Sequence, residues 1–113
     1  MFANPTILSR RGFGMPAYLI VNYNVEDPEG YAEYSASAGS VMKIGDACQL
    51  IAFDPATERL EGESAGHQTI VLRFGSKEEA KALYESGDYQ ALIPKRHAAT
   101  SNHFAILVNG VPG

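Results

Sequence analysis

The amino-acid sequence predicts one α+β domain, in which an antiparallel sheet follows the split β-α-β order of strands and helices. The first observation is the order of segments. Stretches rich in β-branched and aromatic residues alternate with amphipathic helical stretches as β-α-β-β-β-α-α-β. The second is size and balance, since 113 residues that are 45% hydrophobic and 19% charged suit one globular domain. We place this domain at residues 15–110 and interpret residues 1–14 as a flexible N-terminal tail.

The tail, MFANPTILSRRGFG, lacks clear periodicity. Its run from Ser9 to Phe13 (SRRGF) resembles a twin-arginine export signal. A signal peptide needs an apolar run of about 7–15 residues, whereas the run that follows here extends only from Ala17 to Val21. We therefore expect a tail and not the leader of an exported protein.

Composition excludes several classes of function. The formal net charge of −4 is the opposite of the basic surface that nucleic-acid binding needs. No run approaches the roughly 18 apolar residues of a membrane-spanning helix. The single cysteine, Cys48, cannot form an intramolecular disulfide, and a lone thiol fits a reducing compartment. We expect a cytoplasmic protein without nucleic-acid or membrane partners.

The first strand and helix are predicted at the start of the domain. Ala17 to Val25 (AYLIVNYNV) is rich in strand-forming residues, and both of its faces begin apolar, as in a central strand. Asp27 and Pro28 then mark the start of a helix, as the capping and first helical residues. We expect this helix to end at Gly45, which readily adopts left-handed backbone. Its buried stripe is Tyr31, Tyr34, Ala38 and Val41 or Met42.

The middle of the chain predicts a hairpin region. Ala47 to Phe53 forms the second strand, and Asp54-Pro55 supplies a turn. Thr57 to Glu63 is polar, and we expect it to form a short edge strand or hairpin arm. His67 to Phe74 forms the next strand, whose side chains alternate between the two faces of the sheet. One face carries Gln68, Ile70, Leu72 and Phe74, and the other carries His67, Thr69, Val71 and Arg73.

The last third predicts two helices. Ser76 and Glu79 match a capping box, so a helix begins there, and Gly87 ends it. Asp88 is placed to cap a second short helix, which Pro94 bends or splits.

The closing strand, Asn102 to Val108, completes a sheet that the predicted helices cannot cover on both faces. Two helical regions can cover only one face of a sheet, yet the strands are apolar on both faces. The apolar side chains of the other face need a second surface to bury them, and a second copy of the same sheet is the simplest candidate. The expected assembly is a homodimer.

Two motifs resemble those of the domain-of-unknown-function 1330 family, within the dimeric α+β barrel superfamily. They are MPAYLIVNYNVEDPEGYAEY at the start of the domain and RFGSKEEAKALYESGDYQALIPKRHAATS near its end. The resemblance implies a ferredoxin-like fold whose sheets pair face to face into a barrel. The family has no established activity, although related barrels include cofactor-independent monooxygenases, lactone isomerases and haem-binding peroxidases. Extending those activities to this chain would rest on fold alone.

The chain also departs from the family pattern. The family often has a Gly-Gly pair followed by a basic residue where this chain has Gly45-Asp46-Ala47. Its second strand usually ends in a basic residue and glycines where this chain has Phe53-Asp54-Pro55. A basic group that could help to hold an anion is therefore missing.

Two arginines are candidate ligand-binding residues. Arg96 matches the family motif, and its guanidinium offers a fixed fork of donors to a carboxylate. The competing interpretation is a structural ion pair with a carboxylate on a neighbouring helix: Glu33, Glu85 or Asp88. Arg73 lies on a strand face among apolar residues, where it would need a partner from a ligand or from the other subunit.

Histidine and tyrosine supply the weaker candidates. His103 could act as a general base or could simply be hydrogen-bonded at the end of the sheet. The early tyrosines could line a pocket for an aromatic substrate or could pack in the core: Tyr18, Tyr23, Tyr31 and Tyr34. The histidine spacing matches no zinc signature, so we expect no metal and no cofactor.

Two hypotheses for function follow. In the first, the protein binds or transforms a small carboxylate or aromatic molecule in a cleft between sheet and helices. In the second, it is a non-catalytic dimerising or regulatory module with a filled barrel. The sequence leaves open whether the protein is an enzyme.

Overall fold

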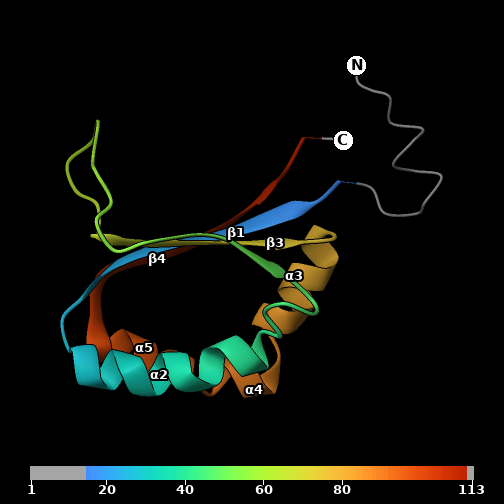
Figure 1. Cartoon of the computed structure of the whole chain (residues 1–113), viewed down its shortest axis with the longest axis horizontal. Coiled ribbons are helices and arrows are strands. Elements are labelled where there is room, and N and C mark those ends of the chain that lie inside the picture. The colour runs from blue at the N-terminus through green and yellow to red at the C-terminus, as the bar shows by residue number, and fades with distance from the viewer. Residues whose placement is uncertain (1–14, 112–113) are drawn as a thin grey trace.

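A computed structural model describes residues 15–111. These residues form a four-stranded antiparallel sheet in the order β2-β3-β1-β4, with the helices on one face (Figure 1). In chain order the elements are β1 (Ala17–Val25), α2 (Pro28–Val41), β2 (Gln49–Asp54), β3 (Gln68–Phe74), α3 (Lys77–Tyr84), α4 (Gly87–Gln90), α5 (Ile93–Ala99) and β4 (Thr100–Asn109). This is the predicted α+β fold with an antiparallel, split β-α-β sheet.

Strand β1 lies at the centre, as its sequence predicts. It pairs antiparallel with β3 on one side and with β4 on the other. Because side chains alternate along a strand, Leu19, Val21 and Tyr23 all point to the helix face, where each is at most 8% exposed. The core is therefore a single layer between this face and the helices.

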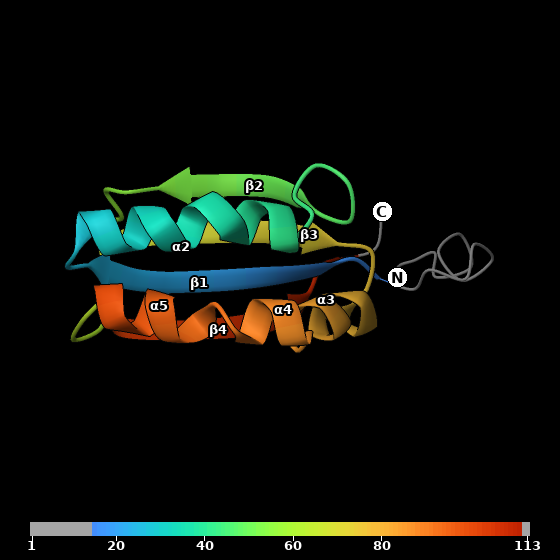
Figure 2. The same cartoon turned by 90° about the horizontal axis from the view of Figure 1, so that it is seen from below.

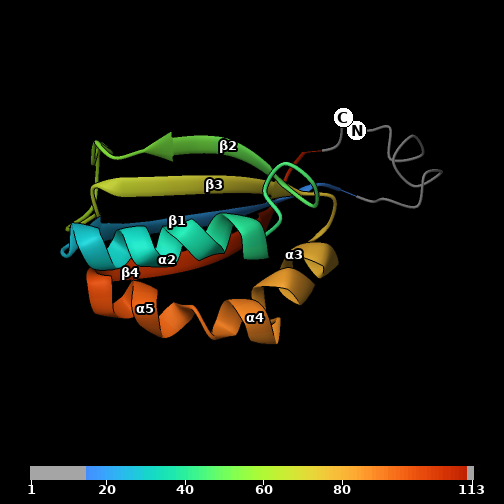
Figure 3. The same cartoon turned by 60° about the horizontal axis from the view of Figure 1, so that its bottom comes forward.

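The helices begin where the capping residues predict. Asp27 Oδ1 accepts a hydrogen bond from Gly30 N at 3.1 Å at the start of α2, and Ser76 Oγ accepts from Glu79 N at 3.1 Å at the start of α3. Helix α2 runs along the sheet over β1 and β3, while α3, α4 and α5 follow one another along β4 (Figures 2 and 3). None of the helices in the described part of the chain is long and apolar enough to span a membrane.

Several element boundaries differ from the sequence prediction. Helix α2 ends at Val41, because Lys43 takes the left-handed conformation (φ 58°) before Gly45 is reached. Residues 57–63 form a loop and not a strand, since Thr57 N bonds only to His67 O and no neighbouring strand pairs with the segment. Ser86, not Asp88, caps α4, which places Gly87 inside that helix.

The opposite face of the sheet carries no helix within residues 15–111 (Figure 1). Phe104, Ile106 and Val108 of β4 project from this face and are 48%, 47% and 38% exposed. In the register they lie beside Asn22, Ile20 and Tyr18 of β1. We call this surface the open face. Its apolar character agrees with the expectation from the sequence that one apolar face of the sheet has no helices over it.

The loop between β2 and β3 is held over one end of the open face by Asn22. The Asn22 amide nitrogen donates to Gly66 O at 3.0 Å and to Thr69 Oγ1 at 2.9 Å, and Gly66 N donates to Asn22 Oδ1 at 2.6 Å. A Cβ on residue 66 would lie 2.2 Å from the Tyr23 carbonyl carbon, so only glycine fits. Asn22 is consequently 4% exposed although no helix covers it.

Replacing Asn22 by alanine is expected to lower the free energy of unfolding by about 1–3 kcal/mol, because Gly66 N and O would lose their buried partner. Chemical denaturation measures this loss. Ser37→Ala on the exposed side of α2 is the matched control and should change stability by less than about 0.5 kcal/mol. Equal stability of the two variants would contradict the anchoring role.

Candidate functional site

A cavity of about 220 Å³ lies between α2 and the helix face of the sheet. Its wall is mostly aliphatic and aromatic and includes four tyrosines and one serine. The lining residues come from β1 (Leu19, Val21, Tyr23), α2 and the turn after it (Tyr31, Tyr34, Ser35, Ala38, Gly39, Met42, Ile44), β2 (Leu50, Phe53), β3 (Ile70, Leu72) and α4 (Tyr89). We call it the α2 cavity.

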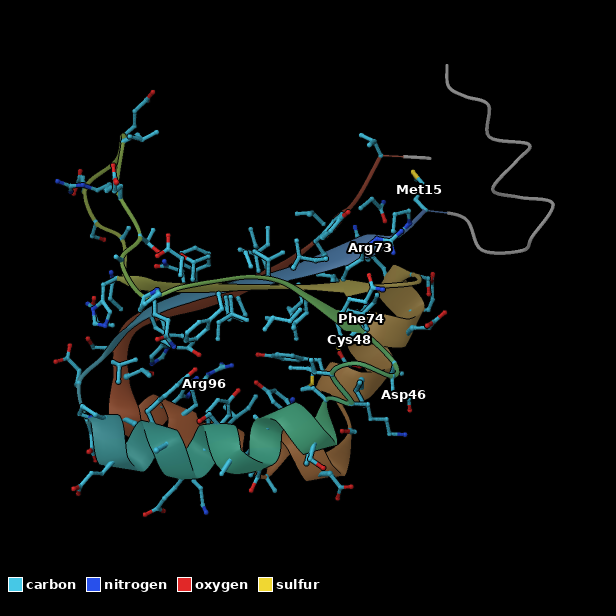
Figure 4. The ribbon with its side chains drawn as sticks, in the orientation of Figure 1. Met15, Asp46, Cys48, Arg73, Phe74 and Arg96 are labelled. Atoms are coloured by element: carbon cyan, nitrogen blue, oxygen red, sulfur yellow. The ribbon has the colours of Figure 1, made fainter. Side chains whose placement is uncertain are left out.

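Arg96 lies behind the tyrosine wall of this cavity. It projects from α5 into the space between helices and sheet (Figure 4) and is only 4% exposed. Its Nη1 donates to the Tyr89 hydroxyl at 2.9 Å, and its Cζ lies 5.7 Å and 6.0 Å from the ring centroids of Tyr23 and Tyr34. Its Nε has no acceptor among the described residues.

The hydroxyl groups form two pairs at the wall of the cavity. Tyr34 and Tyr89 are 2.5 Å apart, and Tyr23 and Tyr31 are 2.8 Å apart. Because a guanidinium has no lone pair to accept with, the Tyr89 oxygen accepts from Arg96. The proton of Tyr89 is then free for Tyr34, which in turn can donate its own proton to a third group. Arg96 thus orders this chain of donors.

Burial keeps the four phenols neutral. It is the largest cause of the raised pKa of each: Tyr23, Tyr31, Tyr34 and Tyr89. Burial is the largest single influence on the pKa of Arg96 and acts to lower it, but the combined effect of Tyr89, Tyr84 and Tyr34 outweighs burial, so its pKa is raised. The cluster therefore carries a permanent positive charge and no ionised phenol at neutral pH.

The structure gives Arg96 phenols and not the carboxylates of the competing interpretation. Glu33, Glu85 and Asp88 are all exposed, and the groups that act on the pKa of Arg96 are tyrosines. Among the described residues, its recorded hydrogen-bond acceptor is the Tyr89 hydroxyl. A structural ion pair does not account for this arginine.

Gln68 is a buried polar residue that the sequence-based candidates missed. It is 6% exposed on β3, directly opposite Tyr23 in the register. Its amide nitrogen lies near enough to the Tyr31 hydroxyl to help lower the pKa of that phenol, yet finds no acceptor with hydrogen-bonding geometry in residues 15–111. A glutamine on the same predicted face as Ile70 and Leu72 was the available signal. Tyr89 was also missed, because its role depends on contacts far along the chain.

The remaining candidates lie elsewhere. Arg73 and Tyr18 are opposite each other in the register on the open face, so the sheet separates them from Arg96. His103 stacks on His97, with ring centroids 4.2 Å apart, and burial lowers the pKa of His97. The structure thus brings Arg96, Tyr34 and Tyr23 together and keeps the other three apart from them. No cluster of His, Cys, Asp or Glu able to hold a metal is found within residues 15–111.

A second hollow, of about 360 Å³, lies between α3 and strands β1 and β4. Its charged lining residues are Lys77, which is half-buried at the start of α3, and Lys81 and Glu85, which are exposed. The Tyr84 ring lies 5.1 Å from that of Tyr89 and stands between this hollow and the α2 cavity. None of these charged lining residues is buried, so the α2 cavity is the stronger candidate for a ligand site.

A family model matches nearly all of the described chain. The model is Domain of unknown function (DUF1330), and it matches residues 16–111. The match confirms the resemblance seen in the two sequence motifs. A comparison with curated proteins gives no match.

Solved structures share the fold at low sequence identity. A protein of unknown function from Rhodopseudomonas palustris aligns with a TM-score of 0.70 and 13% identity, over 99% of this chain and 97% of its own. A dimeric ferredoxin-like protein of unknown function from Thermobifida fusca has a TM-score of 0.60 and 14% identity, over 86% and 92%. SnoaB, a cofactor-independent oxygenase from Streptomyces nogalater, has a TM-score of 0.62 and 7% identity, over 88% and 97%. These likenesses confirm the ferredoxin-like fold and show nothing of the ligand.

The buried phenols predict a loss of stability at alkaline pH. Their pKa values are raised above the unfolded value of 10.0, so the stability that the neutral phenols contribute is full below about pH 10 and falls as the pH rises further. Denaturation at pH values from about 7 to about 11 measures this. The double variant Tyr34→Phe/Tyr89→Phe, which lacks two of these phenols, should show a shallower fall. Ionisation of all six tyrosines in the folded protein, followed by tyrosinate absorbance, would contradict the assignment.

Proposed function

We propose a ligand-binding function for this chain, which belongs to the domain-of-unknown-function 1330 family. The protein binds, and in the enzymatic case transforms, a small apolar or aromatic molecule that carries a carboxylate, and the α2 cavity holds it. One observation carries this proposal: Arg96 is a buried cation whose neighbours in residues 15–111 are neutral phenols.

The energetic argument rests on the cost of an uncompensated charge. Removing a guanidinium from water costs several kcal/mol even after the protein relaxes, and neutral phenols recover only part of that. A methionine or leucine would fill the same space without this cost. An anionic ligand would supply the missing negative charge, which gives the arginine a reason to be there.

The ligand is expected to reach this charge through the tyrosines. Arg96 does not itself line the α2 cavity, but Tyr34 and Tyr89 do, and their hydroxyls continue the donor chain that starts at Arg96. A carboxylate in the cavity accepts from this chain, while Leu50 and Ile70 contact its hydrocarbon part. A cavity of about 220 Å³ suits a single-ring or short-chain ligand, because drug-sized ligands occupy roughly 300–1,000 Å³.

The same donors suit a reaction in which negative charge develops on an oxygen atom. A chain of hydroxyls ordered by a fixed cation stabilises an enolate or phenolate without reorganising. The structural neighbour SnoaB is a cofactor-independent oxygenase, which supports keeping an enzymatic role within the proposal. The alternative of a filled, non-catalytic module agrees less well with a cavity that four tyrosines line.

We also propose that two copies pair through the open face. Phe104, Ile106 and Val108 form an apolar strip there, and Ile20 and Val71 extend it across β1 and β3. Burying such a strip against a second copy removes apolar surface from water in both chains. A dimeric ferredoxin-like protein among the structural neighbours supports this assembly. The expected homodimer leaves the α2 cavities on the outer side of each sheet.

Arg96→Met tests the ligand proposal. Calorimetric titration of the wild type with benzoate and cyclohexanecarboxylate should show binding, whereas benzamide should bind more weakly. The variant should lose at least about 10-fold in affinity for the carboxylates, as expected for a charge-assisted interaction. Its free energy of unfolding should equal or exceed that of the wild type, because a buried charge has been removed.

Arg73→Met, on the open face, is the matched control and should bind as the wild type does. Two results would overturn the proposal. One is the absence of binding by any small carboxylate. The other is an Arg96→Met variant that binds normally but is several kcal/mol less stable, since Arg96 would then serve the fold alone.

Light scattering at micromolar concentration tests the homodimer. The wild type should have a mass of about 24 kDa, twice the 12.2 kDa of the chain. Ile106→Glu should give monomers, because it places a charge in the apolar strip. Ser37→Glu on the outer side of α2 should remain dimeric. A wild-type mass equal to that of one chain would exclude the pairing.

A further inference from the structure

Three large apolar side chains that line the α2 cavity are about half exposed. Leu50 and Phe53 of β2 are 49% and 54% exposed, and Ile44 in the turn after α2 is 40% exposed. Single exposed apolar residues are ordinary on a protein surface, but several that line one cavity form a patch of the kind that marks a binding surface. We call these three residues the β2 shelf.

The β2 shelf lies at the open side of the cavity. Leu50 and Phe53 are opposite Leu72 and Ile70 in the register, so they point to the helix face of the sheet. Strand β2 is an edge strand that lies beyond α2, which runs over β1 and β3 (Figures 2 and 3). The helices of residues 15–111 therefore leave the helix face of β2 uncovered, and the cavity opens to solvent there.

Burial and polarity both increase along the cavity away from this opening. From β2 through β3 to β1 the lining residues become more buried: Phe53 is 54% exposed, Leu72 6% and Tyr23 1%. On the other side of β1, Tyr89 lines the cavity from α4, and its hydroxyl accepts from Arg96 of α5. The cavity thus has a buried, polar end and an open, apolar end. An anion with an apolar tail matches both ends when its carboxylate enters first.

We propose that the ligand of this protein is an amphiphilic acid whose apolar tail lies on the β2 shelf. This inference rests on the proposed function and extends its ligand from the cavity of about 220 Å³ to the surface outside it. The ring or short chain next to the carboxylate fills the enclosed part. The tail leaves through the open end and covers Leu50, Phe53 and Ile44, which removes apolar surface of both partners from water.

Calorimetric titration with benzoate and its 4-ethyl, 4-butyl and 4-hexyl derivatives tests this. A 4-alkyl chain points away from the carboxylate, so it extends towards the β2 shelf when the carboxylate meets the tyrosines. The affinity of the wild type should rise by about 2-fold for each added methylene, since full burial of a methylene gives about 4-fold and the shelf covers only one side of the chain. From benzoate to 4-hexylbenzoate the gain should be at least about 20-fold.

The double variant Leu50→Thr/Phe53→Thr removes most of the apolar surface of the shelf and keeps residues that favour strands. Its gain from benzoate to 4-hexylbenzoate should fall below about 5-fold. This ratio of two affinities is the readout, so any change in the binding of benzoate itself cancels. Phe53→Thr alone should give an intermediate gain, and it provides the test if the double variant does not fold.

Ile51→Thr is the matched control. Ile51 is 50% exposed on the same strand, but it lies in the bulge between Leu50 and Ala52 and does not line the cavity. This variant should keep the full gain of the wild type. Because every residue of β2 is exposed, circular dichroism should show the same fold for the wild type and these variants.

The outcomes distinguish this inference from the function on which it rests. If benzoate binds but the wild type shows no gain with chain length, or if Leu50→Thr/Phe53→Thr keeps the gain, the tail does not lie on the shelf and the carboxylate site stands. A monomeric mass for that variant, together with an unchanged gain, would instead assign the shelf to contact with a second copy. If none of the benzoates binds, the carboxylate site fails and this inference fails with it.

Discussion

The arrangement of the tyrosine cluster depends on one buried positive charge. Arg96 enters the layer between helices and sheet from α5, and its nearest groups within residues 15–111 are phenols from β1, α2 and α4. Four elements must pack together to bring those groups to one guanidinium. The hydroxyl pairs, the neutral state of the tyrosines and the polar wall of the cavity all follow from accommodating this charge away from water.

The single helical layer gives the sheet two surfaces of different character. On the helix side, the space under α2 forms a cavity whose wall includes four tyrosines. On the other side, the sheet ends in an apolar strip, and the Asn22 anchor holds the β2–β3 loop over one end of it. Arg73 and Tyr18 belong to that second side, so the sheet separates them from the α2 cavity.

Most of the secondary structure could be predicted, because its signals are local. The alternation of Ala17–Val25 and the caps at Asp27 and Ser76 depend on neighbouring residues only. The prediction was wrong for residues 57–63, where a polar stretch resembles an edge strand but has no strand to pair with. It was also wrong at Gly45, because Lys43 had already taken the left-handed conformation that ends α2.

The sequence by itself determined the fold, the apolar character of both sheet faces and a short set of candidate polar residues. Periodicity and capping are sufficient for this, since they act within a few residues. Only the tertiary structure separated Arg96 from Arg73, because their surroundings depend on which sheet face the helices cover. It also brought in Tyr89, whose hydroxyl meets that of Tyr34 55 residues away in the chain, and Gln68, which lies opposite Tyr23 on the neighbouring strand. Contacts between distant segments form only when the layers pack, and the site is made of such contacts.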